Sequence, residues 1–118
     1  MRLNEVQFQN VRPVEGYGPG FFRIGAELFH GGVLLRGEHV APWGGYDDSA
    51  ALLALAGVVD VLFIGTGAEI AHLPPDLRNA LDEAGIPHEV MASPPAARSY
   101  NVLLSEGRRI AAALLPVA

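Results

Sequence analysis

Short apolar runs separated by glycine-rich turns make up the first third of the chain. Glycines cluster at residues 16–20, 31–32 and 44–45, and none of the apolar runs near them is long enough for a helix. The pattern therefore predicts short strands arranged as a meander of hairpins. These strands are expected at residues 21–24, 27–29, 33–35 and 39–41. Gly31 and Gly32, a glycine pair between two apolar runs, form the clearest predicted hairpin turn.

From Asp47 onward the pattern changes to an alternation of helices and strands. Asp47 or Asp48 is expected to cap a helix rich in alanine and leucine that ends near Gly57. Residues 58–64 follow as a strand. Because this run is apolar almost throughout, it is typical of a strand that is covered on both faces.

A βαβ unit is predicted next. After the strand at residues 58–64 and the turn at residues 65–67, two prolines open a second helix through about Ala84, and Gly85 closes it. Residues 86–91 form the following strand. Such crossover connections are right-handed and place their two strands parallel, so the ends of both strands are expected at the same edge of the sheet.

The last predicted element is a long amphipathic helix from Ser93 toward Leu115. The Ser93 hydroxyl is expected to cap it, and the prolines that follow suit its first turn. Tyr100, two leucines and the alanines after Ile110 supply an apolar face. Gly107 interrupts the run at a cost of about 1 kcal/mol relative to alanine, which predicts a bend or close packing there.

Two polar segments are expected to meet at the carboxyl edge of the parallel strands, where ligands of α/β sheets bind. One is the turn Gly65-Thr66-Gly67, whose glycines let backbone N–H groups approach an anion. The other is the start of the last helix, which offers free N–H groups, the Ser93 hydroxyl and the Arg98 guanidinium. The sequence therefore predicts a candidate pocket for phosphate or carboxylate.

Each part of this candidate pocket also has a purely structural interpretation. Thr66 and its glycines can form only a tight strand-exit turn. Tyr100 and Asn101, which complete the candidate set, can instead tie the helix to the sheet by satisfying buried backbone groups. Arg108 and Arg109 are typical of a solvated helix surface, although one of them can pair with a carboxylate at the sheet edge. The sequence leaves both interpretations open.

The composition excludes several kinds of chemistry. The chain has no cysteine and no lysine, so it has no thiolate nucleophile, no cysteine-ligated metal, no Schiff-base lysine and no Walker-type phosphate loop. Its four histidines lack metal-ligand spacing, and no serine stands in a Gly-x-Ser-x-Gly turn. We expect no metal and no cofactor, assign no catalytic residue, and favour a binding protein over an enzyme.

Length and charge limit the remaining classes of protein. A chain of 118 residues that is half apolar fits one domain spanning residues 1–118. Its net charge of −5 argues against a nucleic-acid partner, which requires a basic face. No apolar run reaches the roughly 20 residues of a membrane span, and the N-terminal residues lack a signal-peptide pattern, so a cytoplasmic location is expected.

The apolar content also points to a partner. A mean hydropathy of +0.26 in so small a protein predicts that some apolar side chains meet another molecule. The aromatic residues expected to do so are Phe21, Phe22, Phe29 and Trp43.

A set of motifs spread along the chain resembles one known family. The residues that carry the resemblance are Gly16-Tyr17-Gly18-Pro19-Gly20 followed by Phe22-Arg23-Ile24, the lone Trp43, Gly65-Thr66-Gly67, Met91, Ser93, Ala96, Arg98, Tyr100-Asn101, Glu106-Gly107-Arg108 and the run from Ala111 to Leu114. In this order and spacing they resemble the domain of unknown function 498 family over nearly the whole chain.

The resemblance implies a three-layer α/β fold with a mixed central sheet, which fits the predicted N-terminal hairpins, βαβ unit and long C-terminal helix. The resemblance also implies kinship with mitochondrial complex I assembly factor 3, since the eukaryotic branch of this family assists assembly of respiratory complex I together with a second assembly factor. The resemblance therefore implies a non-catalytic binding or assembly protein whose partner is a membrane-complex subunit or an assembly factor. A weak homo-oligomer is a further possibility. The alternative is a small-anion binding protein or enzyme that uses the carboxyl-edge pocket.

Overall fold

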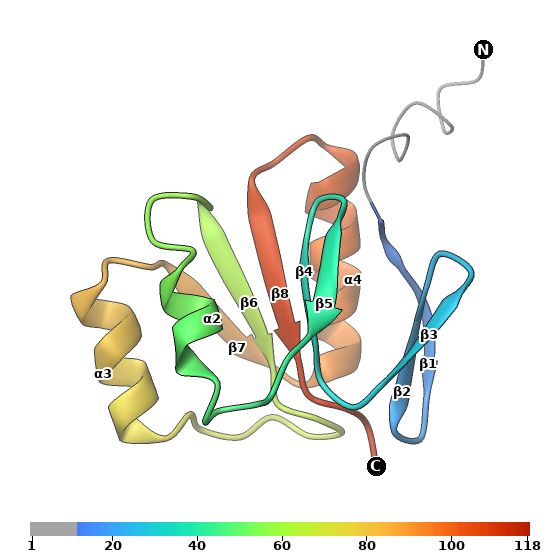
Figure 1. Cartoon of the computed structure of the whole chain (residues 1–118), viewed down its shortest axis with the longest axis horizontal. Helices are drawn as coiled ribbons and strands as arrows, with labels where there is room; N and C mark the ends of the chain where they lie inside the picture. The colour runs from blue at the N-terminus through green and yellow to red at the C-terminus, as the bar shows by residue number, and fades with distance from the viewer. Residues whose placement is uncertain (1–11) are drawn as a thin grey trace.

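A mixed sheet of five strands forms the centre of the fold (Figure 1). The computed structural model describes residues 12–118, so residues 1–5, on which the signal-peptide expectation rests, lie outside it. The strand order of the central sheet is β5-β4-β8-β6-β7, and a separate antiparallel sheet has the order β1-β2-β3. The strands are β1 (Val14–Gly18), β2 (Phe21–Ile24), β3 (Glu27–His30), β4 (Val33–Arg36), β5 (His39–Pro42), β6 (Val61–Gly65), β7 (His88–Met91) and β8 (Ile110–Leu114). The helices described are α2 (Ser49–Leu53), α3 (Pro75–Glu83) and α4 (Ser93–Ser105).

Helices cover both faces of the central sheet, which confirms the predicted three-layer α/β class (Figure 1). Side chains alternate between the faces of a strand, so the apolar run in β6 serves both layers. Phe63 belongs to the apolar cluster on the α4 side, whereas Leu62 and Ile64 belong to the cluster under α2 and α3. The three-stranded sheet adds Phe22 and Ile24 to the cluster on the α4 side.

The βαβ unit is confirmed. β6 and β7 pair in parallel, and α3 lies in the connection between them. Pro75 stands in the first turn of α3, where its missing N–H needs no partner, and Gly85 follows the helix with a φ of 71°. As a result, the turn at residues 65–67 and the start of α4 lie at the same edge of the sheet.

The hairpin turn predicted at Gly31 and Gly32 is wrong, although the four predicted strands are present as β2 to β5. β3 pairs with β2, and β4 pairs with β5 and β8, so the two glycines connect different sheets. Gly31 has a φ of 89°, and a Cβ atom on Gly32 would lie 2.5 Å from the Trp43 carbonyl oxygen. The pair is needed for a close crossing of the backbone rather than for a hairpin.

The helix after Asp48 is shorter than predicted. Asp48 occupies the N-cap position, but its Oδ2 accepts a hydrogen bond from the Gly44 N–H (3.1 Å) instead of capping the helix. The helix α2 ends at Leu53, and turns continue the chain to the region of Gly57, whose φ is 73°. The side chain of Asp48 therefore stabilises the loop before the helix.

The long C-terminal helix is present only in its first half. α4 ends at Ser105, Gly107 takes a φ of 76°, and residues 110–114 form β8. β8 pairs with β4 on one side and β6 on the other, and all five of its residues are buried. Backbone pairing on both sides overrides the high helix propensity of its alanines.

The cap expected for α4 is also corrected, because Ala92 and not Ser93 is its N-cap residue. None of the helices within residues 12–118 has the length and apolar character needed to cross a membrane.

Candidate functional site

The turn after β6 and the start of α4 meet at the carboxyl edge of the sheet. The Gly67 N–H donates to the Ser93 Oγ (2.9 Å), and the Ser93 N–H donates to the Gly67 carbonyl (2.8 Å). The Ser93 hydroxyl in turn donates to the Leu115 carbonyl (2.6 Å). We call this cluster, made of Gly65, Thr66, Gly67, Ser93 and Leu115, the Ser93 junction. It brings together four of the seven residues of the predicted pocket.

The Ser93 junction is closely packed and its polar groups have partners within the chain. Ser93 has no exposed surface, and the Leu115 N–H donates to the Gly65 carbonyl (2.9 Å). A Cβ atom on Gly65 would lie 2.7 Å from the Ser93 Oγ and 2.8 Å from the Leu114 Cδ2. Glycine is thus required at position 65 because β6 and α4 approach each other so closely.

Thr66 organises the loop that follows the junction. Its backbone N–H donates to the Met91 carbonyl (2.8 Å), and its hydroxyl lies 2.7 Å from the Glu69 carbonyl and 3.2 Å from that of Met91. The hydroxyl oxygen also accepts from the Ala71 N–H (3.1 Å). Such local side-chain bonds are typical of turns and hold the loop beside β7.

Arg98 lies on a different surface from the Ser93 junction. It is exposed on α4 and, within residues 12–118, makes no hydrogen bond or ion pair. It lines a hollow of about 360 Å³ that no residue of the junction lines, which we call the α4 hollow. The residues of the α4 hollow are Phe63, Glu89, Arg98, Ser99, Val102 and Leu103.

Tyr100 and Asn101 connect α4 to the strands that lie over it. The fully buried Tyr100 accepts a hydrogen bond from the Gly37 N–H at its hydroxyl oxygen (3.1 Å). Asn101 bonds both backbone groups of Val14, accepting from its N–H (2.9 Å) and donating to its carbonyl (2.7 Å). These are the contacts of the structural interpretation, in which the two side chains satisfy backbone groups.

The environment of Tyr100 also changes its acidity. Burial raises the pKa of Tyr100 to about 12, while the hydrogen bond from Gly37 and the nearby Arg36 guanidinium lower it by less. Burial disfavours the charged phenolate, so the phenol stays protonated at neutral pH. This suits a side chain that holds two elements together.

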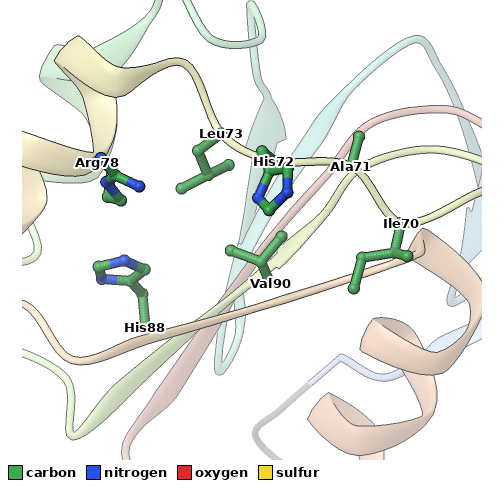
Figure 2. Close-up of a pocket in the computed structure, with 7 residues that line it drawn as sticks. All are labelled: Ile70, Ala71, His72, Leu73, Arg78, His88 and Val90. Atoms are coloured by element: carbon green, nitrogen blue, oxygen red, sulfur yellow. The ribbon is translucent and has the colours of Figure 1, made fainter.

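A groove beside β7, which the sequence did not reveal, combines apolar and basic side chains (Figure 2). It has a volume of about 280 Å³ and is lined from three segments, the loop after the Ser93 junction, α3 and β7. We call it the β7 groove, and its residues are Ile70, Ala71, His72, Leu73, Arg78, His88 and Val90. Ile70 is 68% exposed. The one signal in the sequence is the pair of large apolar residues Ile70 and Leu73 in a loop that is otherwise small or polar.

The aromatic residues expected to meet a partner are mostly covered. Phe22 and Trp43 are buried in the two apolar clusters, and Phe29 packs against one of them. The exposed large apolar side chains within residues 12–118 are instead Tyr17, Leu28, Val58, Ile70 and Val102.

The arginines after α4 lie at the opposite end of the sheet. The Arg109 guanidinium pairs with the Asp60 carboxylate (2.8 Å). Of the two interpretations that the sequence left open for these arginines, this is the pairing with a carboxylate at the sheet edge. Both side chains are about half exposed or more, so the pair adds little to stability. Arg36, Arg108 and Arg109 line a shared hollow of about 550 Å³.

No group of three or more histidine, aspartate or glutamate side chains within residues 12–118 is placed to hold a metal.

Comparison with known proteins gives a consistent result. A family model described as "Protein of unknown function (DUF498/DUF598)" matches residues 14–115. An uncharacterized protein of Rhodobacter capsulatus is 54% identical over 117 residues, which cover 99% of this chain and 94% of that protein. NADH dehydrogenase (ubiquinone) 1 alpha subcomplex assembly factor 3 of Mus musculus is 29% identical over 121 residues, covering 97% of this chain.

The assembly factors are longer than this chain, which spans 60–65% of the length of those that it matches. Among solved structures, a crystal structure described as that of an outer membrane protein from Bartonella henselae superposes with a TM-score of 0.81 at 32% identity. The match covers 94% of this chain and 99% of that chain. This chain and that structure therefore share the same overall fold.

Proposed function

This chain belongs to the DUF498/DUF598 family of proteins of unknown function, and from that premise we propose that it is a non-catalytic binding protein that assists assembly of a respiratory membrane complex. The observation that carries the proposal is the alignment of the mouse assembly factor with 97% of this chain. Such a match includes the central sheet and both helical layers. A role that depends on this shared unit is therefore the simplest one to carry over.

The chemistry of the described surface supports binding rather than catalysis. The Ser93 hydroxyl, which was expected to face a ligand at the carboxyl edge, is buried and hydrogen-bonded to both Gly67 and Leu115. The sequence contains no cysteine or lysine to replace it. In contrast, Ile70 and Val102 are more than half exposed beside hollows, as residues that contact a protein partner often are.

The proposal includes the kind of partner and the place of action. The partner is a subunit of the membrane complex or a second assembly factor, met in the cytoplasm. Nucleic acid is not a partner, in keeping with the net charge of −5. Any homo-oligomer is weak and is measured by size-exclusion chromatography over a range of concentrations.

Deletion of the gene in its own organism tests the proposal. The deletion strain should contain less assembled NADH dehydrogenase complex on native gels and accumulate partial complexes, and the wild-type gene should restore assembly. Affinity capture of the tagged full chain should recover a subunit of that complex or an assembly factor. Normal assembly in the deletion strain would overturn the proposal.

Binding of a small phosphate or carboxylate at the carboxyl edge is the second candidate. The meeting of Gly65, Thr66 and Gly67 with Ser93 supports it, although a ligand has to displace the Ser93 bond to the Gly67 N–H. Phosphate, nucleotides and metabolite carboxylates should then raise the melting temperature, since a ligand of the native state stabilises it. If none of these anions raises the melting temperature, this candidate is wrong.

A further inference from the structure

The outer edge of β7 carries backbone groups with no strand beside them. β7 is an end strand of the central sheet and has β6 as its one neighbour within residues 12–118. The Met91 carbonyl accepts from the Thr66 N–H, and alternate residues of a parallel strand bond to the same neighbour. The N–H and carbonyl groups of His88 and Val90 therefore point away from β6, toward the free edge.

The opposite edge of the same sheet is protected in a way that β7 is not. Trp43 follows β5 and lies opposite Gly32, which precedes β4, in the same register as the two strands. Its N–H donates to the Gly32 carbonyl (2.9 Å), so the backbone groups of Trp43, and of every second residue before it, point toward β4. In the antiparallel ladder Val40 and Pro42 then point outward. Pro42 has no N–H and blocks the pairing of a further strand. β7 has no proline at either of its outward positions.

Hollows lie on both sides of the β7 edge. His88 and Val90 line the β7 groove on the α3 side, and Glu89 lines the α4 hollow on the other side. Because side chains of a strand point alternately to opposite faces, a strand added beside β7 would place its side chains over both hollows. Ile70 in the β7 groove is 68% exposed and Val102 in the α4 hollow is 57% exposed, so each offers an apolar contact to the side chains of the added strand on its own face.

The charges of the β7 groove favour a bound segment with acidic side chains. Its ionisable side chains are His72, Arg78 and His88, which are all basic, and no aspartate or glutamate lines it (Figure 2). Counted as in the net charge of −5, with histidine neutral, the lining of the groove carries one positive charge, on Arg78, and no negative charge. A segment that carries acidic and apolar side chains therefore fits the β7 groove.

We propose that β7 takes up an extended segment of the protein partner as a sixth strand of the sheet. The inference rests on the proposed function and adds to it the binding mode and the chemistry of the segment. Backbone hydrogen bonds to His88 and Val90 hold the segment, and the β7 groove selects its apolar and acidic side chains.

The first experiment compares one substitution on the two edges. Val90→Pro removes an outward N–H of β7, and Val40→Pro makes the same change at an outward position of β5. Both are introduced into the tagged full chain, and recovery of the partner that wild type captures is measured. We expect Val90→Pro to reduce recovery at least tenfold and Val40→Pro to leave it within twofold of wild type.

The outcomes separate this inference from the proposed function. If wild type captures no respiratory subunit or assembly factor, the proposed function fails. If it captures one and Val90→Pro captures as much, the proposal for β7 is overturned. Circular dichroism checks folding, and if Val90→Pro is unfolded the exposed substitution Ile70→Glu decides, since a carboxylate there should repel an acidic segment and also lower recovery tenfold.

The second experiment identifies the segment. A photoreactive benzoylphenylalanine replaces Ile70, with the same replacement at Ala41 on β5 as the control. Cross-linked peptides from position 70 should come from an acidic and apolar stretch of the partner. Cross-links to a second copy of this chain, or to a basic stretch, would overturn the proposal.

The cross-linked segment, made as a capped synthetic peptide, then tests the backbone bonds. It should bind the full chain and protect the His88 and Val90 amides from hydrogen exchange. The same peptide with N-methyl groups on alternate amides should bind at least tenfold more weakly. Equal binding by both peptides contradicts strand addition.

Discussion

The Ser93 junction and the β7 groove are neighbours along the chain, but their polar groups are used in opposite ways. At the junction, the N–H and hydroxyl groups of Gly67 and Ser93 bond to one another or to Leu115. Along β7, the outward backbone groups of His88 and Val90 meet no strand of residues 12–118. A glycine-rich turn facing a helix start is thus equally typical of a ligand site and of a structural joint. A ligand site and a structural joint are distinguished by whether their polar groups already have hydrogen-bond partners within the chain.

The comparison is tested most strongly by Gly65→Ala. The added methyl group would lie 2.8 Å from the Ser93 Cα, a backbone atom that cannot move alone. We expect the free energy of unfolding, measured by urea denaturation, to fall by about 3 kcal/mol. Gly16→Ala is the control, because a Cβ atom there meets nothing within 4 Å. Equal stability of the two variants would show that the junction is not closely packed.

Ser93→Ala should have the next largest effect. It leaves the Gly67 N–H and the Leu115 carbonyl without their hydrogen-bond partner in a buried place, at a cost of about 2 kcal/mol. Ser105→Ala removes a hydroxyl that is bonded to the Val102 carbonyl in an exposed place, and should change stability by less than about 0.5 kcal/mol. A Ser93→Ala protein as stable as the control would favour a hydroxyl kept for ligand binding.

Tyr100 extends the comparison to a pH dependence. Its pKa is raised by burial to about 12, above the ordinary value of 10.0, so the folded state favours the protonated phenol. The contribution of the protonated Tyr100 phenol to the free energy of unfolding is fully present below pH 10 and is lost as pH rises toward 12. Wild type should lose up to about 3 kcal/mol across that window relative to Tyr100→Phe, at 1.36 kcal/mol per pKa unit.

The measurement for Tyr100 is urea denaturation of both proteins at a series of pH values. Burial also raises the pKa of Tyr46, but Tyr46 is present in both proteins and its effect cancels in the difference. Parallel stability curves from pH 10 to pH 12 would contradict the prediction.

The smallest effect on stability is expected in the β7 groove. Ile70 is mostly exposed, so Ile70→Ser should change the free energy of unfolding by less than about 0.5 kcal/mol. Partner binding, measured by titration calorimetry, should nevertheless weaken at least tenfold. Leu28→Ser, an exposed leucine on β3, should leave both quantities unchanged. Loss of stability without loss of binding would make Ile70 a structural residue.

The fold was predictable where local signals agreed with the tertiary structure. The two prolines and Gly85 mark the ends of α3, and the apolar run before Gly65 marks a buried strand. β8 was missed because alanine-rich residues have high helix propensity, and only its position between two other strands makes them extended. The signal that could have revealed the break is Gly107, which ends α4 in a left-handed conformation.

The candidate site was predictable in part for a similar reason. The meeting of the turn at residues 65–67 with Ser93 follows from the parallel βαβ unit. The separation of Arg98 does not, because it depends on which face of α4 turns toward the sheet. The β7 groove depends on the path of an irregular loop, which no periodicity encodes.

The central place of β8 has a consequence for how the protein is made. The strands β4 and β5 lie on one side of β8 and β6 and β7 on the other, yet β8 is the last strand of the sheet in chain order. While the ribosome is still adding residues 110–114, the two halves have no strand to join them, and the apolar edges of β4 and β6 are open to wrong pairing. Sheet closure is therefore a late, long-range step, and a nascent chain halted before β8 is the form most in need of a chaperone.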